Sequence, residues 1–414
     1  MEQNQFVAFS GGLLIDGIGS EPIPNSVLIV QGRQIRAVGK KDEIVIPSDC
    51  RVVDISGKSI MPGMFDCHCH FTEITQDFTT KLFTHKTVKI FQTAAVLRRL
   101  LQAGFTTVRE AGILNDIGLK AAEQKGLFES PRILMAGGIG QIGGHFDEYY
   151  PSGTQLNLFN IEMCPGGVDA MRASARKVLR EGYDFVKVCA TGGVVSPADE
   201  PDFTEWSPEE LEVAVYEARA RNKAVMAHCV GSKGTKNAIR AGIWSVEHGV
   251  MLDDEAVSLM VERGTFLVPT LFIIHEIAEH GKDMGLTPVS LAKAQGMKAR
   301  HIASFQLALA AGVKIAVGTD GIVDTHHGKN AKELELMVNY GMTPLQAITA
   351  ATKTSAQVCR IDSLVGTLVS GKEADLLVID GNPLDDIRIL QDPAYLLMVM
   401  KAGICYVDKI GESQ

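Results

Sequence analysis

The sequence predicts an α/β protein in which a (β/α)8 TIM barrel stands beside a small β-sandwich domain. The barrel is predicted because strand and helix patterns alternate through the middle of the chain, and because reactive polar residues follow the strands. The sandwich is predicted because short strands punctuated by glycine recur near both ends of the sequence. A doubly wound open sheet is the alternative, but no G-x-G-x-x-G motif follows the first barrel strand.

The composition is that of a protein with a sizeable core. The chain has 414 residues, 46% hydrophobic and 21% charged, which allows one large catalytic domain and a smaller one. A net charge of −9 argues against partners such as nucleic acid or an anionic membrane. No apolar stretch reaches the roughly 18 residues of a membrane span, and the polar N-terminus lacks a signal-peptide pattern. We therefore expect a cytoplasmic protein that acts on a small molecule; a homo-oligomer is compatible with this composition.

The predicted sandwich domain comprises residues 1–58 and 364–414. Strands this short need partners, and the two ends of the chain are otherwise unmatched. The strands expected in it are Phe6–Phe9, Leu13–Ile15, Ser26–Val30, Ile35–Val38, Arg51–Asp54, 366–368, 374–380, Leu396–Lys401 and Ile404–Val407.

The predicted barrel comprises residues 59–363 and contains eight strands separated by helices. The strands are 60–66, Thr106–Arg109, Arg132–Ala136, Phe185–Val188, Ala224–Ala227, Ser245–Glu247, Thr265–Val268 and Lys314–Val317. Helical patterns between them include Val88–Gln102, Val168–Arg180, Pro208–Arg221, Asp253–Val261 and Leu291–Ala310. Several of these helices are followed by a glycine typical of a left-handed C-cap: Gly104, Gly182, Gly242, Gly264 and Gly312.

A His-x-His motif at the end of the first barrel strand is the first candidate for a metal site. Side chains alternate along an extended strand, so His68 and His70 project from the same face and can hold one ion. Cys67 and Cys69 then point to the opposite face, into packing. The eight cysteines include no Cys-x-x-Cys pair, so we expect reduced thiols.

Further reactive side chains are predicted at the carboxyl ends of later strands, which form the active-site face of such a barrel. They are His145 after the third strand, Lys187 in the fourth, His228 after the fifth, His248 after the sixth and Asp320 after the eighth. The histidines expected on surfaces or helices away from this face are His85, His275, His280 and His301.

Lys187 is unusual because it stands among β-branched and aromatic residues within a strand. A lysine inside a barrel must be paired, neutralised or modified. A buried amine can react with carbon dioxide to give a carbamate whose two oxygens bridge two cations. The alternative is a lysine that points outward and keeps its charged end in water.

Taken together, these motifs resemble those of the amidohydrolase superfamily over essentially the whole chain. The motifs are 65–70, Lys187, 226–228, 246–249 and 318–320, and the resemblance extends to 103–109 and 371–376. Within the superfamily the chain is similar to the branch that contains imidazolonepropionase-related hydrolases and metal-dependent dipeptidases. Those dipeptidases are of the Xaa-Pro dipeptidase and arginine carboxypeptidase kind, and ochratoxin-type amidases are relatives.

The resemblance implies a centre of two divalent ions. Zn²⁺ fits the expected nitrogen and oxygen ligands, although manganese, cobalt or nickel would fit almost as well. Asp320 would bind the more buried ion and serve as the catalytic acid and base. The ligands implied are His68 and His70 for the more buried ion, His228 and His248 for the more exposed ion, and N6-carboxylated Lys187 as the bridge.

The activity implied is hydrolysis of an amide or peptide bond in a small substrate, such as a dipeptide or N-acyl amino acid with a free C-terminal carboxylate. A hydroxide shared by the ions would be the nucleophile. A lactonase or an imidazolonepropionase-like cyclic amide or imide hydrolase is the alternative, with the same metal chemistry. A deaminase is disfavoured because no glutamate closely follows His228, and a metal-free scaffold because all six metal positions hold competent residues.

Residues that bind the substrate are harder to predict. His145 is expected either to donate to the substrate carbonyl oxygen or only to bind substrate. Prolidase-like relatives tend to carry a tyrosine where this chain has Val230, so proline-type specificity is not expected. The candidates for binding a substrate carboxylate are Arg109, His145, Tyr149, Tyr150 and Lys233.

Overall fold

The barrel predicted from the sequence is confirmed. The computed structural model describes residues 6–113, 117–147, 161–196 and 199–410. Within these ranges seven strands form one sheet in which neighbours along the path are parallel. They are β7 (Met64–Cys69), β8 (Phe105–Glu110), β9 (Arg132–Gln141), β11 (Phe185–Cys189), β12 (Ala224–Cys229), β13 (Ser245–His248) and β14 (Phe266–Val268). A short strand, β10 (Glu162–Cys164), pairs with β9.

The predicted eighth strand closes the barrel as a single-bridge segment. Ile315 forms a parallel bridge with Leu267 of β14. On the other side, the N–H of Cys67 in β7 donates to the carbonyl of Val317, and the N–H of Asp320 donates to the carbonyl of His68. Residues 314–320 therefore join the last strand to the first and place Asp320 beside His68.

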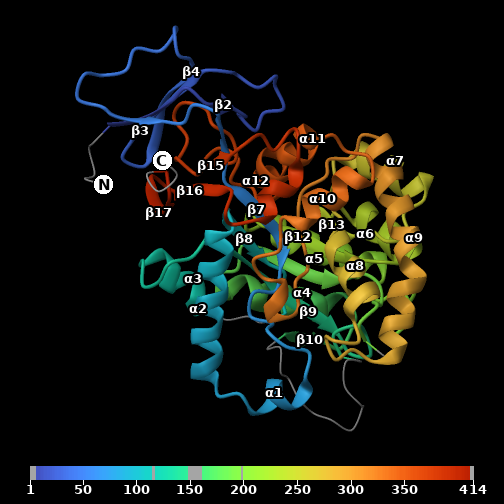
Figure 1. Cartoon of the computed structure of the whole chain (residues 1–414). Helices are drawn as coiled ribbons and strands as arrows, with labels where there is room; N and C mark the ends of the chain where they lie inside the picture. The colour runs from blue at the N-terminus through green and yellow to red at the C-terminus, as the bar shows by residue number, and fades with distance from the viewer. Residues whose placement is uncertain (1–5, 114–116, 148–160, 197–198, 411–414) are drawn as a thin grey trace.

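Helices surround the barrel, and the five predicted from the sequence are present with ends shifted by at most three residues (Figure 1). A polar capping box of Ser207 and Glu210 begins α5, and α4, α6 and α7 end on Gly182, Gly242 and Gly264 with positive φ. The helices are α1 (Phe78–Phe83), α2 (Lys86–Gln102), α3 (Ile117–Gln124), α4 (Val168–Glu181), α5 (Pro208–Arg219), α6 (Ser232–Ala241), α7 (Asp254–Arg263), α8 (Leu271–His280), α9 (Pro288–Ala310), α10 (Lys332–Asn339), α11 (Pro344–Thr349) and α12 (Ser355–Val358), with short turns η1 (Asp324–His326), η2 (Ala350–Thr354) and η3 (Ile387–Gln391).

Two further sheets form the part of the molecule that lies above the barrel in Figure 1. The four-stranded sheet has the order β4-β3-β1-β5, and the five-stranded sheet has the order β17-β16-β15-β6-β2. The second sheet combines both ends of the chain, because β6 pairs antiparallel with β15. The strands are β1 (Phe6–Ser10), β2 (Leu13–Leu14), β3 (Ser26–Gln31), β4 (Gln34–Lys40), β5 (Arg51–Asp54), β6 (Lys58–Pro62), β15 (Leu376–Asp380), β16 (Leu396–Lys401) and β17 (Ile404–Asp408).

The first barrel strand was predicted a few residues too early. The segment 60–66 is divided at Gly63, where a Cβ would clash with the side chain of Thr106. Residues before this glycine form β6 in the five-stranded sheet, and residues after it form β7 in the barrel. The apolar run therefore contributes one buried strand to each of two sheets. Because both strands are buried, hydrophobic periodicity alone could not show where one ends and the other begins.

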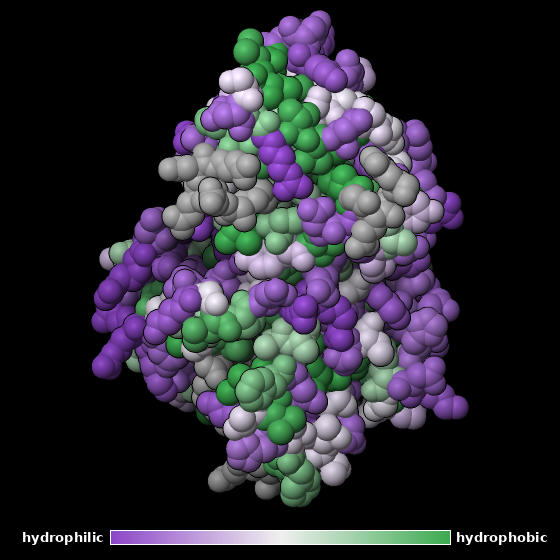
Figure 2. All heavy atoms as spheres, turned by 60° about the vertical axis from the view of Figure 1, so that its left-hand side comes forward, coloured by the Kyte–Doolittle hydropathy of each residue, from purple (hydrophilic) through white to green (hydrophobic). Residues whose placement is uncertain are grey.

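Apolar side chains are exposed on α1 and α2, in the lower part of the view in Figure 2. Phe83 and Phe91 are 78% and 72% exposed, and Leu82, Val88 and Ile90 lie near them in the sequence. Contiguous apolar patches often mark contact surfaces, and the homo-oligomer stays a prediction. No helix among the described residues is long and apolar enough to cross a membrane.

Candidate active site

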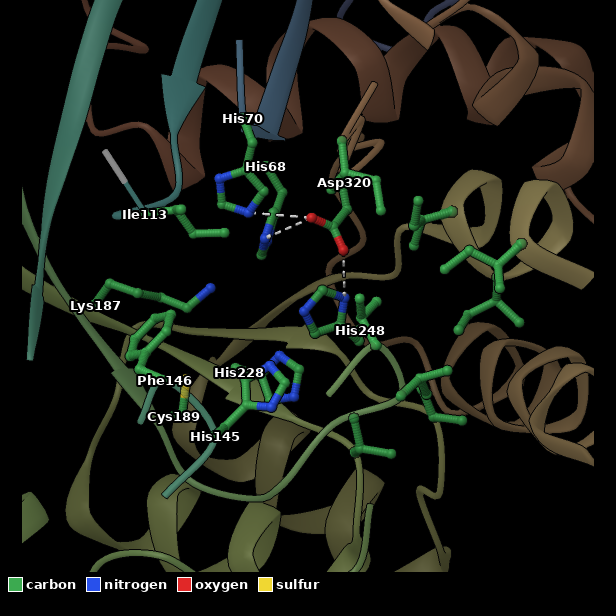
Figure 3. Close-up of a pocket in the computed structure, with 18 residues that line it drawn as sticks. His68, His70, Ile113, His145, Phe146, Lys187, Cys189, His228, His248 and Asp320 are labelled. Carbon is green, nitrogen blue, oxygen red and sulfur yellow. Dashed lines mark ion pairs between the residues drawn. The ribbon is translucent and has the colours of Figure 1, made fainter. Parts of the chain in front are cut away.

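One pocket opens at the carboxyl ends of the barrel strands and collects the metal-site residues predicted from the sequence (Figure 3). β7, β11, β12 and β13 each deliver side chains to it, and the segment after Val317 delivers Asp320. His145, from the loop after β9, also lines the pocket. The predicted residues brought together are His68, His70, His145, Lys187, His228, His248 and Asp320.

Asp320 lies at the centre of three imidazoles. Its Oδ1 is 3.1 Å from His70 Nε2 and 3.6 Å from His68 Nε2, and its Oδ2 is 3.9 Å from His248 Nδ1. Ligand atoms of His68, His248 and Asp320 all lie within 4.8 Å of one another. This spacing allows one cation to contact all three residues.

Buried carboxylates hold the two histidines of the His-x-His motif from behind. His68 Nδ1 is 2.8 Å from Glu247 Oε2, and His70 Nδ1 is 3.1 Å from Glu110 Oε1. Glu247 also accepts from Arg109 Nη2 at 2.9 Å. Because each carboxylate accepts a hydrogen bond from an Nδ1–H group, the Nε2 atoms face the pocket as possible metal ligands, which is the usual arrangement around a metal-binding histidine.

Three residues at or just after the carboxyl ends of barrel strands are held in a conformation that L-residues seldom adopt. His248, Thr270 and Asp320 have φ values of 72°, 51° and 57°. The Thr270 hydroxyl lies 2.7 Å from His248 Nδ1, and buried His301 of α9 lies with its Nε2 3.1 Å from the His248 carbonyl oxygen. Strained backbone of this kind is maintained only where the surroundings impose it, and it is concentrated at functional sites. His301 was expected to lie away from the site, but its contact with the His248 carbonyl oxygen supports the site.

Lys187 points into the pocket from β11 and is 3% exposed. Its Nζ forms no hydrogen bond or ion pair with any residue that the structure describes. Two glycines make room for it: Gly138 faces it across the β9–β11 ladder, and a Cβ on Gly112 would lie 2.8 Å from Lys187 Cβ. The alternative of an outward-pointing lysine is wrong. A buried amine without a partner is the state that must be modified or neutralised.

His145 and His228 stack, with ring centroids 4.5 Å apart and planes inclined by 19°. His145 Nδ1 is 2.7 Å from Asp199 Oδ2, which also accepts from the Gly193 N–H at 2.8 Å. His228 Nε2 is 3.2 Å from the Gly192 carbonyl oxygen. These contacts leave His145 Nε2 and His228 Nδ1 without a hydrogen-bond partner among the residues that the structure describes.

Burial sets the protonation of the histidines. It lowers the pKa values of His68, His228 and His248 well below the ordinary value, helped by neighbouring positive groups. His70 differs: burial opposes its charged form, yet contacts with Asp320 and Glu110 outweigh this and raise its pKa to about 9. Two carboxylates that attract a proton to His70 would equally attract a metal cation.

The donor set fits divalent metal ions. It offers four imidazoles, three of them favoured in the neutral form that binds metal, together with the Asp320 carboxylate and a lysine without a partner. Nitrogen and oxygen donors of this kind suit zinc and neighbouring transition metals.

The other predicted substrate contacts are not brought to this pocket. Arg109 is fully buried behind it, with Nε donating to the Cys67 carbonyl at 2.5 Å. Lys233 is exposed on the first turn of α6 and does not line the pocket. Their placement gives no support to a role in binding substrate. Tyr149 and Tyr150 lie outside the described residues.

The comparison with known families agrees with this geometry. A model described as the amidohydrolase family matches residues 59–405. The chain belongs to the amidohydrolase family. It is therefore a hydrolytic enzyme of a family that is generally metal-dependent and acts on small molecules, and the resemblance inferred from the motifs is confirmed.

Proteins similar to this chain include an ochratoxinase, a prolidase and a Xaa-Pro dipeptidase. Ochratoxinase from Aspergillus niger is 36% identical over 95% of this chain and 85% of its own length. A crystal structure of a prolidase complexed with N-methylphosphonate-L-proline superposes with a TM-score of 0.89 at 29% identity, over 98% of this chain and all of that one. A Xaa-Pro dipeptidase structure with methionine bound in the active site gives a TM-score of 0.88 at 31% identity, over 97% of this chain and all of that one.

Sequence reasoning missed the carboxylates that support this amidohydrolase site. Glu110 ends β8, and Glu247 immediately precedes His248 in β13, so both stand at the active-site end of a strand. Their position at strand ends could have identified both glutamates from the sequence. Asp199 lies outside the helices and strands, where no periodic pattern marked it.

Proposed function

We propose that this amidohydrolase cleaves the amide bond of a dipeptide or N-acyl amino acid and uses two divalent ions to do so. The observation that carries the proposal is the pocket in which four histidines, Asp320 and an unpaired buried lysine converge. The similarity to dipeptidase and ochratoxinase structures supports amide hydrolysis as the reaction.

The proposed metal ligands are the predicted ones. His68 and His70 would hold the more buried ion with Asp320, His228 and His248 the other, and a carbamate on Lys187 would bridge them. Divalent ions bound there would lower the pKa of a coordinated water and polarise the substrate carbonyl. Zinc remains the proposed metal.

Asp320 is the proposed acid and base. Its carboxylate faces the histidine cluster and its side chain is 17% exposed, so it is accessible to a bound substrate. It would accept the proton of the attacking water as the new C–O bond forms, and then pass that proton to the nitrogen of the departing amine as the C–N bond breaks. Proton transfer of this kind contributes on the order of 10²–10⁴ in rate.

His145 is proposed to donate to the substrate carbonyl oxygen as negative charge develops on it. Because Asp199 occupies Nδ1, donation must come from Nε2. An imidazole whose Nδ1 proton is shared with a carboxylate donates from Nε2 only when that nitrogen is protonated too. Burial raises the pKa of Asp199, but the contact with His145 outweighs burial and lowers it, so Asp199 stays a carboxylate that accepts at His145 Nδ1.

The proposed substrate carries a free carboxylate on its amine-side residue. The support is the similarity to a prolidase with a proline-derived ligand and to a dipeptidase with bound methionine. Val230, which stands where prolidase-like relatives tend to carry a tyrosine, lines the pocket. We therefore propose that residues other than proline are accepted at the C-terminal position.

The test compares kcat/KM for matched pairs of dipeptides, one member with a free acid and the other with a C-terminal amide. The zinc-loaded protein should cleave the acids and not the amides. Asp320→Asn, which keeps the shape of the side chain but cannot accept the proton, should abolish turnover without loss of fold. Cleavage of a lactone or cyclic imide, with no dipeptide cleaved, would instead support the alternative hydrolase.

A further inference from the structure

The pocket has two chemically different sides. The metal-site residues form one side, and aliphatic side chains form the other (Figure 3). The aliphatic side chains come from three separate parts of the chain: the segment after β11, the helix α8 and the segment after Asp320. This apolar wall consists of Val194, Val195, Ile273, Ile274, Ile277 and Ile322.

The apolar wall is a packed structure. Its members belong to one hydrophobic cluster that is separate from the barrel core and is backed by Ala294 of α9 and by partly buried Met284, Leu286 and Met297. Ile274 and Ile277 are only 5% and 1% exposed. The wall is therefore held by its own small core.

Glu333 fixes the helix that supplies half of the apolar wall. Its fully buried carboxylate accepts from the N–H groups of Leu271 and Phe272, at 2.9 and 2.6 Å. These are the first residues of α8, whose N-cap side chain makes no capping hydrogen bond because Thr270 faces His248 instead. Glu333 thus caps α8 from α10 and sets the position of the wall relative to the metal-site residues.

The charge of the pocket is confined to one side. Among the lining residues that the structure describes, the ionisable side chains are the metal-site residues, His145 and Cys189. No arginine, glutamate or second lysine of that described set faces the apolar wall. A charged or strongly polar substrate group placed there would lose its hydration without gaining a partner.

We infer that the apolar wall is a specificity subsite for an uncharged aliphatic or aromatic side group next to the scissile amide. The inference rests on the proposed amide hydrolysis and narrows its substrate class to amides with a hydrophobic residue. Removing methylenes from a group that fits such a pocket costs about 10- to 200-fold in kcat/KM. The ratio of kcat/KM for a leucine or phenylalanine side group to kcat/KM for alanine should therefore lie within or above this range.

The experiment uses a set of dipeptides with free carboxylates, in which each position in turn carries alanine, leucine, phenylalanine, lysine or glutamate. We expect kcat/KM for leucine or phenylalanine at one position to exceed that for alanine by at least about tenfold, and lysine and glutamate there to be the poorest. Equal rates for charged and apolar side groups would overturn the inference and leave amide hydrolysis intact.

Binding supplies a readout that does not need turnover. Calorimetric titration of the same dipeptides into Asp320→Asn should reproduce the order of preference. If apolar dipeptides bind best but the wild type cleaves none of them, the proposed reaction is wrong and the subsite assignment stands. If neither binding nor cleavage shows a preference for apolar side groups, the subsite assignment is wrong.

A pair of isoleucine variants locates the preference. Ile274→Ala should raise the phenylalanine-to-leucine ratio of kcat/KM by several-fold, because the larger group fills the vacated space. Ile239→Ala is the matched control: Ile239 is fully buried in α6 and does not line the pocket. Both variants should lose stability, but only the first should change the ratio; an equal change in both would contradict the assignment.

Discussion

At the scale of single residues, the site depends on side chains that hold other side chains. Glu247, Glu110 and Asp199 each face the Nδ1 atom of a pocket histidine. That these histidines, Lys187 and Asp320 share one pocket could be predicted, because His-x-His and the strand-end residues have recognisable spacing. These supporting contacts could not, since they join positions such as His68 and Glu247 that are 179 residues apart.

Lys187→Ala should reduce metal content. If a carbamate on Lys187 joins two ions, its loss removes a shared ligand, and the protein should fall from about two divalent ions per chain to one or none. Inductively coupled plasma mass spectrometry measures the content, and ¹³C-labelled bicarbonate should give a carbamate resonance in the wild type but not in Lys187→Ala. Exposed Lys125→Ala is the control. Two ions and full activity in Lys187→Ala would refute the bridge.

Asp199→Asn should lower kcat by about 10- to 100-fold with a smaller effect on KM, because His145 loses the carboxylate that fixes its orientation. Glu200→Gln, at an exposed position in the same segment, should leave kcat unchanged. A wild-type kcat in Asp199→Asn would mean that the contact with His145 is only structural.

At the scale of elements, helices were easier to predict than the segments around the pocket. Periodicity and C-terminal glycines located α4 and α7, and caps such as Gly182 and Gly264 confirmed the reasoning. The eighth strand was placed correctly along the chain, but its single bridge to Leu267 depends on the closure of the barrel. α8 was missed because it is apolar on most faces and its N-terminus is capped by Glu333, a residue 62 positions away from Leu271.

The cap of α7 provides a test with a defined pH dependence. Asp253 accepts from the Ala256 N–H, Ser232 and Lys236. Burial tends to raise its pKa, but these contacts outweigh burial and lower it to about 2. Asp253→Ala should cost about 1 kcal/mol at pH 7. A folded-state pKa below the unfolded value of 3.8 stabilises the protein above that pH, and the benefit is lost as the pH falls toward 2.

Thermal unfolding at pH 7 and pH 3 measures this effect. The side chain of Asp253 is 45% exposed, so solvent screening limits the charge contribution to well under 1 kcal/mol. Asp253→Asn, which keeps the cap, should therefore resemble wild type more closely than Asp253→Ala does, and its small deficit should shrink at pH 3. Asp254→Asn, one residue later, is the control; an equal loss in that variant would assign the effect to helix charge alone.

At the scale of the whole molecule, a buried cluster of charges joins the barrel to the five-stranded sheet. Arg132 at the start of β9 reaches Asp375 at 2.8 Å and Glu373 at 2.7 Å. Asp375 is almost completely buried, and Glu373 also accepts from Arg33. The two parts of the molecule are thus joined by a polar contact as well as by apolar packing.

Arg132→Leu should destabilise the protein by about 3 kcal/mol, because it leaves the buried carboxylate of Asp375 without its cation. The urea concentration at the midpoint of unfolding measures the loss. Arg388→Leu, which removes an arginine from an exposed pair with Asp386, should cost less than about 1 kcal/mol. Similar midpoints for the two variants would show that burial does not strengthen the contact of Arg132.

The pairing of distant segments also has a consequence for how the protein emerges from the ribosome. β6 cannot pair in the five-stranded sheet until β15 has been synthesised, and the Cys67 N–H cannot form its hydrogen bond until Val317 has been synthesised. The nascent chain consequently exposes the His68 edge of β7 until more than two hundred further residues have been synthesised. Neither sheet can be completed during most of translation, so β7 keeps an unpaired edge until the chain is nearly finished.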